Sequence, residues 1–252
     1  MPHKIAFEGV FFDLGNTLAP FTPRDSMEFV VKWFFASGIE GSGPSFFDFL
    51  QSYRAVILRE REIMAARPWE TDVGTRSRMI AEDLVSRGFP DRDIASRLER
   101  SHTGAFTSSL RMGRGGREVL EALSSSVSPS GKRPRIGLIS NAADGAAIRT
   151  FLDRERIRHH FDSVVISDEE GFGKPHPEIF LLPLRRLGLD PASSVYIGDR
   201  YVVDVVGARN VGMKAVYIRE HHTTGEPPEG LEISPPVIED ILDLPPLLSQ
   251  GF

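Results

Sequence analysis

Residues 10–18 (VFFDLGNTL) constrain the fold of this chain more than any other segment. The apolar run before Asp13 is typical of a buried strand, and the residues after it are turn-formers. Asp13 is therefore expected at the carboxyl end of a strand. In open α/β sheets this edge binds ligands, because loops form a crevice there and helix N-termini point into it. Asp13 is either a nucleophile or metal ligand at that edge, or a residue that only caps a turn.

The later part of the chain alternates between helical and strand patterns. Apolar runs predict strands at 135–139, 163–166, 195–197 and 215–218, and helices are predicted at 116–124, 145–154, 177–187 and 203–210. Strands at this spacing with helical crossovers predict an α/β fold with a doubly wound parallel sheet. Beyond residue 219 the Pro-rich tail is expected to hold little more than one short helix near 237–242.

A helical insertion interrupts this pattern after residue 18. Amphipathic helices are predicted at 26–36, 46–66, 75–87 and 94–105, with Gly- and Pro-containing breaks between them and no convincing strand. We therefore expect two units: a core formed by residues 1–19 and 113–252, and an inserted all-helical unit at 20–112.

Composition narrows the classes of function. The chain has 252 residues, 40% of them hydrophobic, and a formal net charge of -5. A net negative charge does not indicate a basic surface for nucleic acid or an anionic membrane, so binding to either is disfavoured. The absence of cysteine excludes disulfides and thiol nucleophiles. No run approaches the roughly 20 apolar residues of a membrane span, and the N-terminal apolar stretch is too short for a signal peptide, so we expect a cytoplasmic protein.

Polar residues follow three of the predicted strands, at Asp13, at Ser140-Asn141 and at Asp199. If these strands are neighbours, the polar groups converge on one crevice, to which Lys174 and Asp204 also contribute. This set suits attack on phosphorus. Two acids could hold Mg²⁺ through oxygen ligands, while the cation and a lysine neutralise the phosphoryl oxygens. One carboxylate could then attack and form an aspartyl-phosphate.

With these residues in view, the sequence resembles the haloacid dehalogenase superfamily over essentially the whole chain. Four segments are similar to its four motifs, in the family's order and at the ends of the expected strands: 12–18 (FDLGNTL), 139–141 (ISN), 173–177 (GKPHP) and 198–204 (GDRYVVD). The insertion at 20–112 resembles the family's helical cap. The resemblance implies a Rossmann-like core and a hydrolase that uses Mg²⁺.

The resemblance also implies a role for each matched residue. It implies that Asp13 is the nucleophile and that Ser140 and Lys174 hold the transferring group. The implied substrate-binding residues are Asn16, Thr17, Ser140, Asn141 and Lys174. The implied metal site consists of Asp13, the backbone carbonyl of Gly15 and Asp199, with Asp204 in support.

The first motif departs from the family pattern at one position. The family's phosphatases usually carry a second Asp two residues after the nucleophile, where it acts as general acid and base; here that residue is Gly15. The carbonyl that the family uses as a metal ligand survives this change, and the carboxylate does not. Proton donation typically supplies about 10²–10⁴ in rate, so the departure bears on turnover more than on metal binding.

Four functions remain open on this evidence. The first is a Mg²⁺-dependent phosphatase of a small phosphorylated metabolite. A dehalogenase also lacks the second Asp, but the family's dehalogenases lack the metal-binding acid that Asp199 supplies. A phosphonate-cleaving enzyme would need a cap lysine, for which only Lys32 is available. The fourth is a binding or regulatory protein with slow or no turnover. Cap candidates for substrate selection are Arg54, Arg61 and Trp69.

Overall fold

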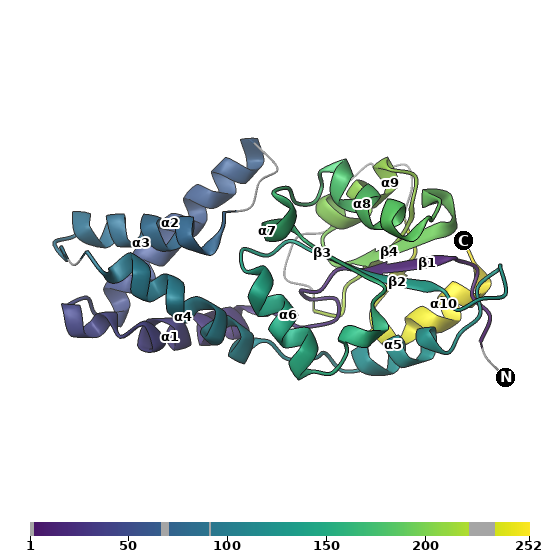
Figure 1. Ribbon diagram of the computed structural model, residues 1–252, viewed down its shortest axis with the longest axis horizontal. Helices are drawn as coiled ribbons and strands as arrows, with labels where there is room; N and C mark the ends of the chain where they lie inside the picture. Colours follow the sequence, from purple (N-terminus) through teal and green to yellow (C-terminus); the bar gives the residue numbers. More distant parts are fainter. Residues whose placement is uncertain (1–2, 67–70, 91, 222–234) are drawn as a thin grey trace.

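The protein is built around a parallel sheet that has β1 in its interior (Figure 1). The computed structural model describes residues 3–66, 71–90, 92–221 and 235–252, and in this part of the chain the sheet has six strands in the order β3-β2-β1-β4-β5-β6. They are β1 Gly9–Phe12, β2 Arg135–Ser140, β3 Ser163–Ile166, β4 Ser194–Gly198, β5 Lys214–Ile218 and β6 Val237–Ile238. Every pairing is parallel. The predicted doubly wound α/β sheet is confirmed.

Helices cover both faces of the sheet, because successive strand residues point to opposite sides. On β1, Val10 and Phe12 belong to one apolar cluster and Phe11 to another. The first cluster packs under α5 (Gly116–Ser124), α6 (Gly145–Arg154) and α10 (Leu244–Gln250). The second packs under α8 (Pro177–Leu187), the π-helical turn Tyr201–Val206 and α9 (Gly207–Asn210). The short α7 (Ser167–Glu170) follows β3.

The tail differs from its prediction. Residues 237–242 do not form a helix: Val237–Ile238 is strand β6, and a 3₁₀ turn follows at Ile241–Asp243. The edge of β5 explains the strand, since its backbone N–H groups need acceptors. Tyr217 donates to the carbonyl of Pro236 (2.9 Å) and Arg219 to that of Ile238 (2.9 Å). A short apolar run leaves helix and strand unresolved in sequence, and here the free sheet edge decides for strand.

The inserted residues form a separate group of helices beside the core (Figure 1). They are α1 Pro23–Ser37, α2 Phe46–Ala66, α3 Val73–Ser86 and α4 Ile94–Ser109, each close to its predicted range. Their own apolar cluster surrounds Trp33, whose indole N–H donates to the carbonyl of Leu98 (2.8 Å). We propose residues 20–112 as the boundaries of this cap. None of the described helices, the 21-residue α2 included, is both long and apolar enough to cross a membrane.

Two kinds of contact fix the cap to the core. Where the chain leaves and re-enters the core, the N–H of Gly113 donates to the carbonyl of Leu18 (2.8 Å). Further along, α4 packs on α6 through Asp144, the N-cap residue of α6. Its carboxylate accepts from His102 Nδ1 (2.8 Å), from the Thr103 hydroxyl (2.8 Å) and from the first turn of its own helix. Asp144 thus serves helix α6 and the cap interface together.

We predict that Asp144→Ala lowers the free energy of unfolding by about 2–4 kcal/mol. Loss of an N-cap costs about 1 kcal/mol, and stranding buried partners such as His102 adds about 1–3 kcal/mol. Urea unfolding at pH 7 measures the change. Asp190→Ala is the matched control, because Asp190 is an exposed N-cap that serves only a 3₁₀ turn. Equal losses in the two variants would contradict the interface role.

Candidate active site

Neighbouring strands bring the predicted polar residues to one edge of the sheet. Strand β1 pairs with β2 on one side and with β4 on the other. Asp13 follows β1 and continues its ladder, donating from its backbone N–H to the carbonyl of Ile197 (2.9 Å). Ser140 ends β2, and Asp199 comes directly after β4. The expectation that these strands are adjacent is confirmed.

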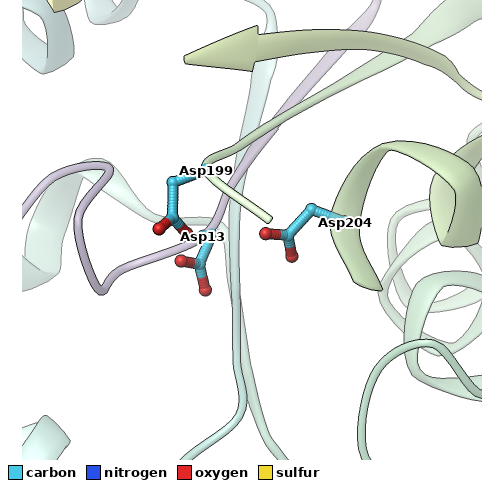
Figure 2. A group of neighbouring side chains, drawn as sticks. All are labelled: Asp13, Asp199 and Asp204. Carbon is cyan, nitrogen blue, oxygen red and sulfur yellow. The ribbon is translucent and has the colours of Figure 1, made fainter. Parts of the chain in front are cut away.

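Three buried aspartates converge at this edge (Figure 2). Asp13, Asp199 and Asp204 each offer a carboxylate oxygen, and these oxygens lie within 4.8 Å of one another. Their exposed fractions are 6%, 4% and 0%. Only oxygen donors are present, which is the donor set that hard divalent cations such as Mg²⁺ prefer. The residues therefore fit a bound Mg²⁺.

Lys174 supplies the positive charge of the cluster. Its side chain, 2% exposed, donates from Nζ to Asp13 Oδ1 (2.6 Å), Asp204 Oδ1 (2.7 Å) and the Tyr196 hydroxyl (2.8 Å). An ammonium has three donors, and all three are used. The contact with Asp13 fixes the orientation of the predicted nucleophile.

The position of Asp204 depends on Gly198. A Cβ atom at Gly198 would lie 2.5 Å from the Asp204 side chain, so only glycine lets the two segments approach this closely. In that position Asp204 Oδ2 accepts from the backbone N–H of Arg200 (2.9 Å). Because its other oxygen accepts from Lys174, Asp204 holds both the lysine and the loop that carries Asp199.

The cluster holds more negative than positive charge, and the pKa values reflect this. Burial raises the pKa of Asp13 to about 6, although the Lys174 ammonium opposes the shift. Burial and the charges of Asp13 and Asp204 raise the pKa of Asp199 to about 8. Burial alone would lower the pKa of Lys174, but Asp13 and Asp204 hold it above its ordinary value. The lysine therefore stays charged. Among the described residues it bonds Asp13 and Asp204, whereas for Asp199 the charges of Lys174 and Arg200 only partly offset the rise in pKa.

These residues open onto a cavity of about 330 Å³ between core and cap. Five of the residues predicted to bind substrate or to act in catalysis line it directly: Asp13, Asn16, Ser140, Asn141 and Lys174. Two of them also form hydrogen bonds to the backbone of the surrounding loops. Asn16 Oδ1 accepts from the backbone N–H of Phe21 (2.8 Å). The Asn141 amide bonds the N–H and the carbonyl of Lys174 (2.7 and 2.9 Å) and so fixes the lysine loop.

Thr17 stands apart from the rest of the predicted set. It is not among the residues that line the cavity, and its buried hydroxyl has no hydrogen-bond partner in the part of the chain that the structure describes. Its role in binding substrate stays a prediction.

Gly15 lines the cavity beside Asp13 in an open position. A Cβ atom there would meet no other atom within 4 Å. Its φ is not in the left-handed region; that conformation falls to the next residue, Asn16, at φ 55°. Glycine at this position is therefore not required by the backbone or by packing.

Sequence reasoning missed several residues of the site. Tyr196, Arg76, His102 and Arg200 were not predicted, yet Tyr196 bonds Lys174 and the other three line the cavity. The exposed Arg54 does not line it, and Trp69 and the Arg61 side chain lie outside the described residues. One available signal was Tyr196 itself, a phenol inside a predicted strand, since a buried phenol needs a hydrogen-bond partner.

The fold and site together define a doubly wound α/β core with a lysine and three buried aspartates at the carboxyl edge of its sheet. The profile of the haloacid dehalogenase-like hydrolase family matches residues 50–218, well over half of the chain. The chain therefore belongs to the haloacid dehalogenase-like hydrolases.

Relatives of known activity match parts of the chain. Over 120 residues it is 41% identical to glyceraldehyde 3-phosphate phosphatase of Methanothermobacter thermautotrophicus, which covers 45% of this chain and 51% of the relative. Over 89 residues it is 39% identical to phosphoserine phosphatase of Thermus thermophilus, which covers 33% and 34%. The matches thus span about half the length of these relatives or less.

Solved structures match nearly the whole chain at low identity. A HAD-hydrolase, YfnB from Bacillus subtilis bound to magnesium, has a TM-score of 0.69 at 16% identity and covers 95% of this chain and 97% of that one. The 2-haloacid dehalogenase of Pseudomonas syringae has a TM-score of 0.68 at 22% identity, with 99% of each chain covered. At these identities the likeness is one of fold.

We predict that Mg²⁺ raises the melting temperature, and more so at high pH. Asp13 and Asp199 have folded pKa values of about 6 and about 8, against 3.8 as the ordinary value. The folded chain therefore binds more protons than the unfolded chain in this range, and its metal-free stability falls as pH rises from about 4 through about 8. A cation that takes the place of those protons stabilises the folded state by linkage.

Thermal denaturation with and without Mg²⁺ at pH 5.5 and pH 8.5 tests this prediction. The Mg²⁺-induced increase should be the larger at pH 8.5, and Asp199→Ala should remove most of it, whereas the surface variant Asp190→Ala should retain it. If Mg²⁺ leaves the melting temperature unchanged at both pH values, the prediction is wrong and a dehalogenase is favoured.

Proposed function

We propose that the protein is a Mg²⁺-dependent phosphatase of a small phosphorylated metabolite, acting through an aspartyl-phosphate on Asp13. One observation carries the proposal: a buried carboxylate is held by a lysine at the floor of a cavity, next to a second acid, Asp199, whose charge is only partly compensated. The glyceraldehyde 3-phosphate and phosphoserine phosphatases among the partial matches support this class of activity.

In the proposed reaction an oxygen of Asp13 attacks phosphorus, and the ester P–O bond breaks. Lys174 holds the attacking carboxylate in place and offers positive charge to the phosphoryl oxygens. Ser140, at the end of β2, is positioned to hold another of these oxygens. Water then attacks the phosphorus of the aspartyl-phosphate and frees both phosphate and Asp13.

Asp13, Asp199 and the carbonyl of Gly15 would hold the metal. When bound, Mg²⁺ would neutralise charge on the phosphoryl oxygens. Asp204 contributes indirectly, because its two oxygens already accept from Lys174 and from the backbone of Arg200.

Three other functions are weaker candidates. A phosphonate-cleaving enzyme would need Lys32 at the cavity, but Lys32 pairs with Glu28 and does not line it.

A dehalogenase function would explain why residue 15 is glycine, and it agrees with the likeness in fold to the 2-haloacid dehalogenase of Pseudomonas syringae. It gives no role to the buried acid Asp199. A regulatory protein that has lost turnover also accounts for Gly15, but it has no need of the complete set of Asp13, Lys174 and Asp199. The phosphatase uses all of these residues.

Asp13→Asn should abolish phosphatase activity, because an amide cannot attack phosphorus. Loss of a catalytic nucleophile costs on the order of 10⁴–10⁶ in kcat. The measurement is a screen of phosphorylated metabolites, with and without Mg²⁺, for wild type, Asp13→Asn and the surface control Asp190→Asn. Full activity in a folded Asp13→Asn variant would exclude Asp13 as the nucleophile.

Gly15→Asp should raise activity selectively towards alkyl phosphates. Alkyl leaving groups need a proton as they depart, and the new carboxyl group would supply it, worth about 10²–10⁴ in rate. The open space around Gly15 and its ordinary backbone conformation leave room for the side chain. Activated aryl phosphates leave without a proton and should gain little.

The measurement is the ratio of alkyl- to aryl-phosphate kcat/KM in wild type, Gly15→Asp and Gly15→Asn. The asparagine variant has the same size but no acid, so its ratio should match the wild type. If a stable, Mg²⁺-binding Gly15→Asp variant has an unchanged ratio, another group already donates the proton, and the missing carboxylate does not limit turnover.

A further inference from the structure

The cavity above Asp13 has two chemically different sides. The core side is polar and carries the charged residues of the site. The cap side and its two connections are largely apolar. We call this side the apolar wall, and its members are Phe21, Phe29, Tyr53, Ile57, Phe106 and Leu110. A substrate whose phosphoryl group lies on Asp13 would place its leaving group against this wall.

Ring contacts hold the apolar wall in a defined shape. The rings of Phe21 and Phe106 meet edge to face with centroids 5.6 Å apart, and Phe29 meets Phe106 at 5.2 Å. Phe29 in turn stacks on Trp33, in the centre of the cap cluster, at 5.5 Å. Such aromatic pairs add about 0.5–1.5 kcal/mol each beyond burial. The wall is therefore formed before any substrate arrives.

Part of the apolar wall is not covered by the protein's own packing. Phe21, Tyr53, Ile57 and Phe106 are only half-buried. A group that covers an apolar side chain gains about 25 cal/mol for each Å² removed from water. An apolar leaving group that covers these side chains would gain this free energy, whereas a strongly hydrated one would lose its hydration without an equal gain.

The charged side chains of the cap side already have partners. The guanidinium of Arg76 binds the buried carboxylate of Glu60 through Nε and a terminal nitrogen (2.9 Å each). His102 bonds Asp144. Within the described residues, Arg76 is thus committed to Glu60. His102 is uncharged because burial lowers its pKa, and its buried Nε2, which has no partner among these residues, can bond a polar group without supplying a charge. The cap side therefore offers no uncommitted positive charge to a second anionic group on a substrate.

Gly15 adds an independent constraint on the same leaving group. No carboxylate stands two residues after Asp13 to protonate a departing oxygen. Phenolic oxygens, with an ordinary pKa of about 10, leave far more readily without a proton than those of alkyl alcohols. The apolar wall and Gly15 therefore favour the same chemistry.

Resting on the proposed phosphatase function, we propose that the substrate is a small aryl phosphate: a phosphate monoester of an uncharged phenol whose ring packs on the apolar wall. A bond forms between Asp13 and phosphorus as the P–O(aryl) bond breaks, and the electron pair stays on the phenolate oxygen, which water then protonates. Hydrolysis of the aspartyl-phosphate by water releases phosphate.

A panel of substrates distinguishes the effect of the aromatic ring on kcat/KM from the effect of the leaving group. With Mg²⁺ present, kcat/KM should be highest for phenyl phosphate, lower for benzyl phosphate, and lowest for glyceraldehyde 3-phosphate and phosphoserine. O-phosphotyrosine has the phenolic leaving group with a charged tail, and we expect it to fall at least tenfold below phenyl phosphate. Acetyl phosphate serves as a ringless substrate with a good leaving group.

Variants of the apolar wall supply the decisive comparison. Phe106→Ala should lower kcat/KM for phenyl and benzyl phosphate about 10–100-fold, the equivalent of burying part of an aromatic side chain, and change acetyl phosphate less than about threefold. Ile57→Ala should do the same to a smaller degree and gives a second route if Phe106→Ala does not fold. Phe47→Ala is the matched control, since Phe47 is 63% exposed and does not line the cavity.

The outcomes distinguish this proposal from the function on which it rests. If no member of the panel, acetyl phosphate included, is hydrolysed in a Mg²⁺-dependent way, the phosphatase assignment itself fails. If acetyl phosphate or phosphoserine is hydrolysed but phenyl phosphate is not preferred, or if the wall variants affect ring and ringless substrates equally, the phosphatase stands and the aryl phosphate proposal is overturned.

Discussion

The ammonium of Lys174 is the charge on which the rest of the site depends. A buried ammonium is costly to remove from water, and it is tolerated only where its donors are satisfied and its charge is compensated. Its three partners, Asp13, Tyr196 and Asp204, come from the end of β1, from within β4 and from the turn that follows β4. Lys174 therefore joins the end of β1 to a much later part of the chain, β4 and the turn after it, and the position of Asp13 follows from that junction.

The same cluster carries more negative than positive charge. One lysine faces three buried aspartates. Burial first, and then the neighbouring carboxylates, raise the pKa values of Asp13 and Asp199. Such an arrangement lowers the stability of the metal-free protein at neutral pH and above. Electrostatic strain of this kind is typical of sites selected for binding rather than for stability.

The parts of the fold and site that could be predicted from the sequence are those that a short stretch of neighbouring residues determines. The strands around Asp13, Ser140 and Asp199 were predictable because each is a short apolar run that ends on a polar residue, and the helices because each repeats its apolar residues at helical spacing. Strand β6 was not, because two residues become a strand only when the edge of β5 is there to pair with them. The bonds from Asn141 to the backbone of Lys174 link residues far apart in sequence, and no local pattern encodes such a contact. The apolar wall was not predicted, since the sequence does not say which aromatic rings face inward and which face a cavity.

The hydrogen bond between Gly113 and Leu18 bears on how this protein could have arisen and could be altered. Because the two connections of the cap meet at one point, the core resumes almost where it stopped, and β1 and β2 pair as though nothing lay between them. The path of the core chain at this point therefore does not depend on the length of the insertion between the two connections. An insertion of different length or helix number could therefore be joined to this core at Leu18 and Gly113, and the side chains above Asp13 would change while Lys174 and the aspartates keep their places in the core.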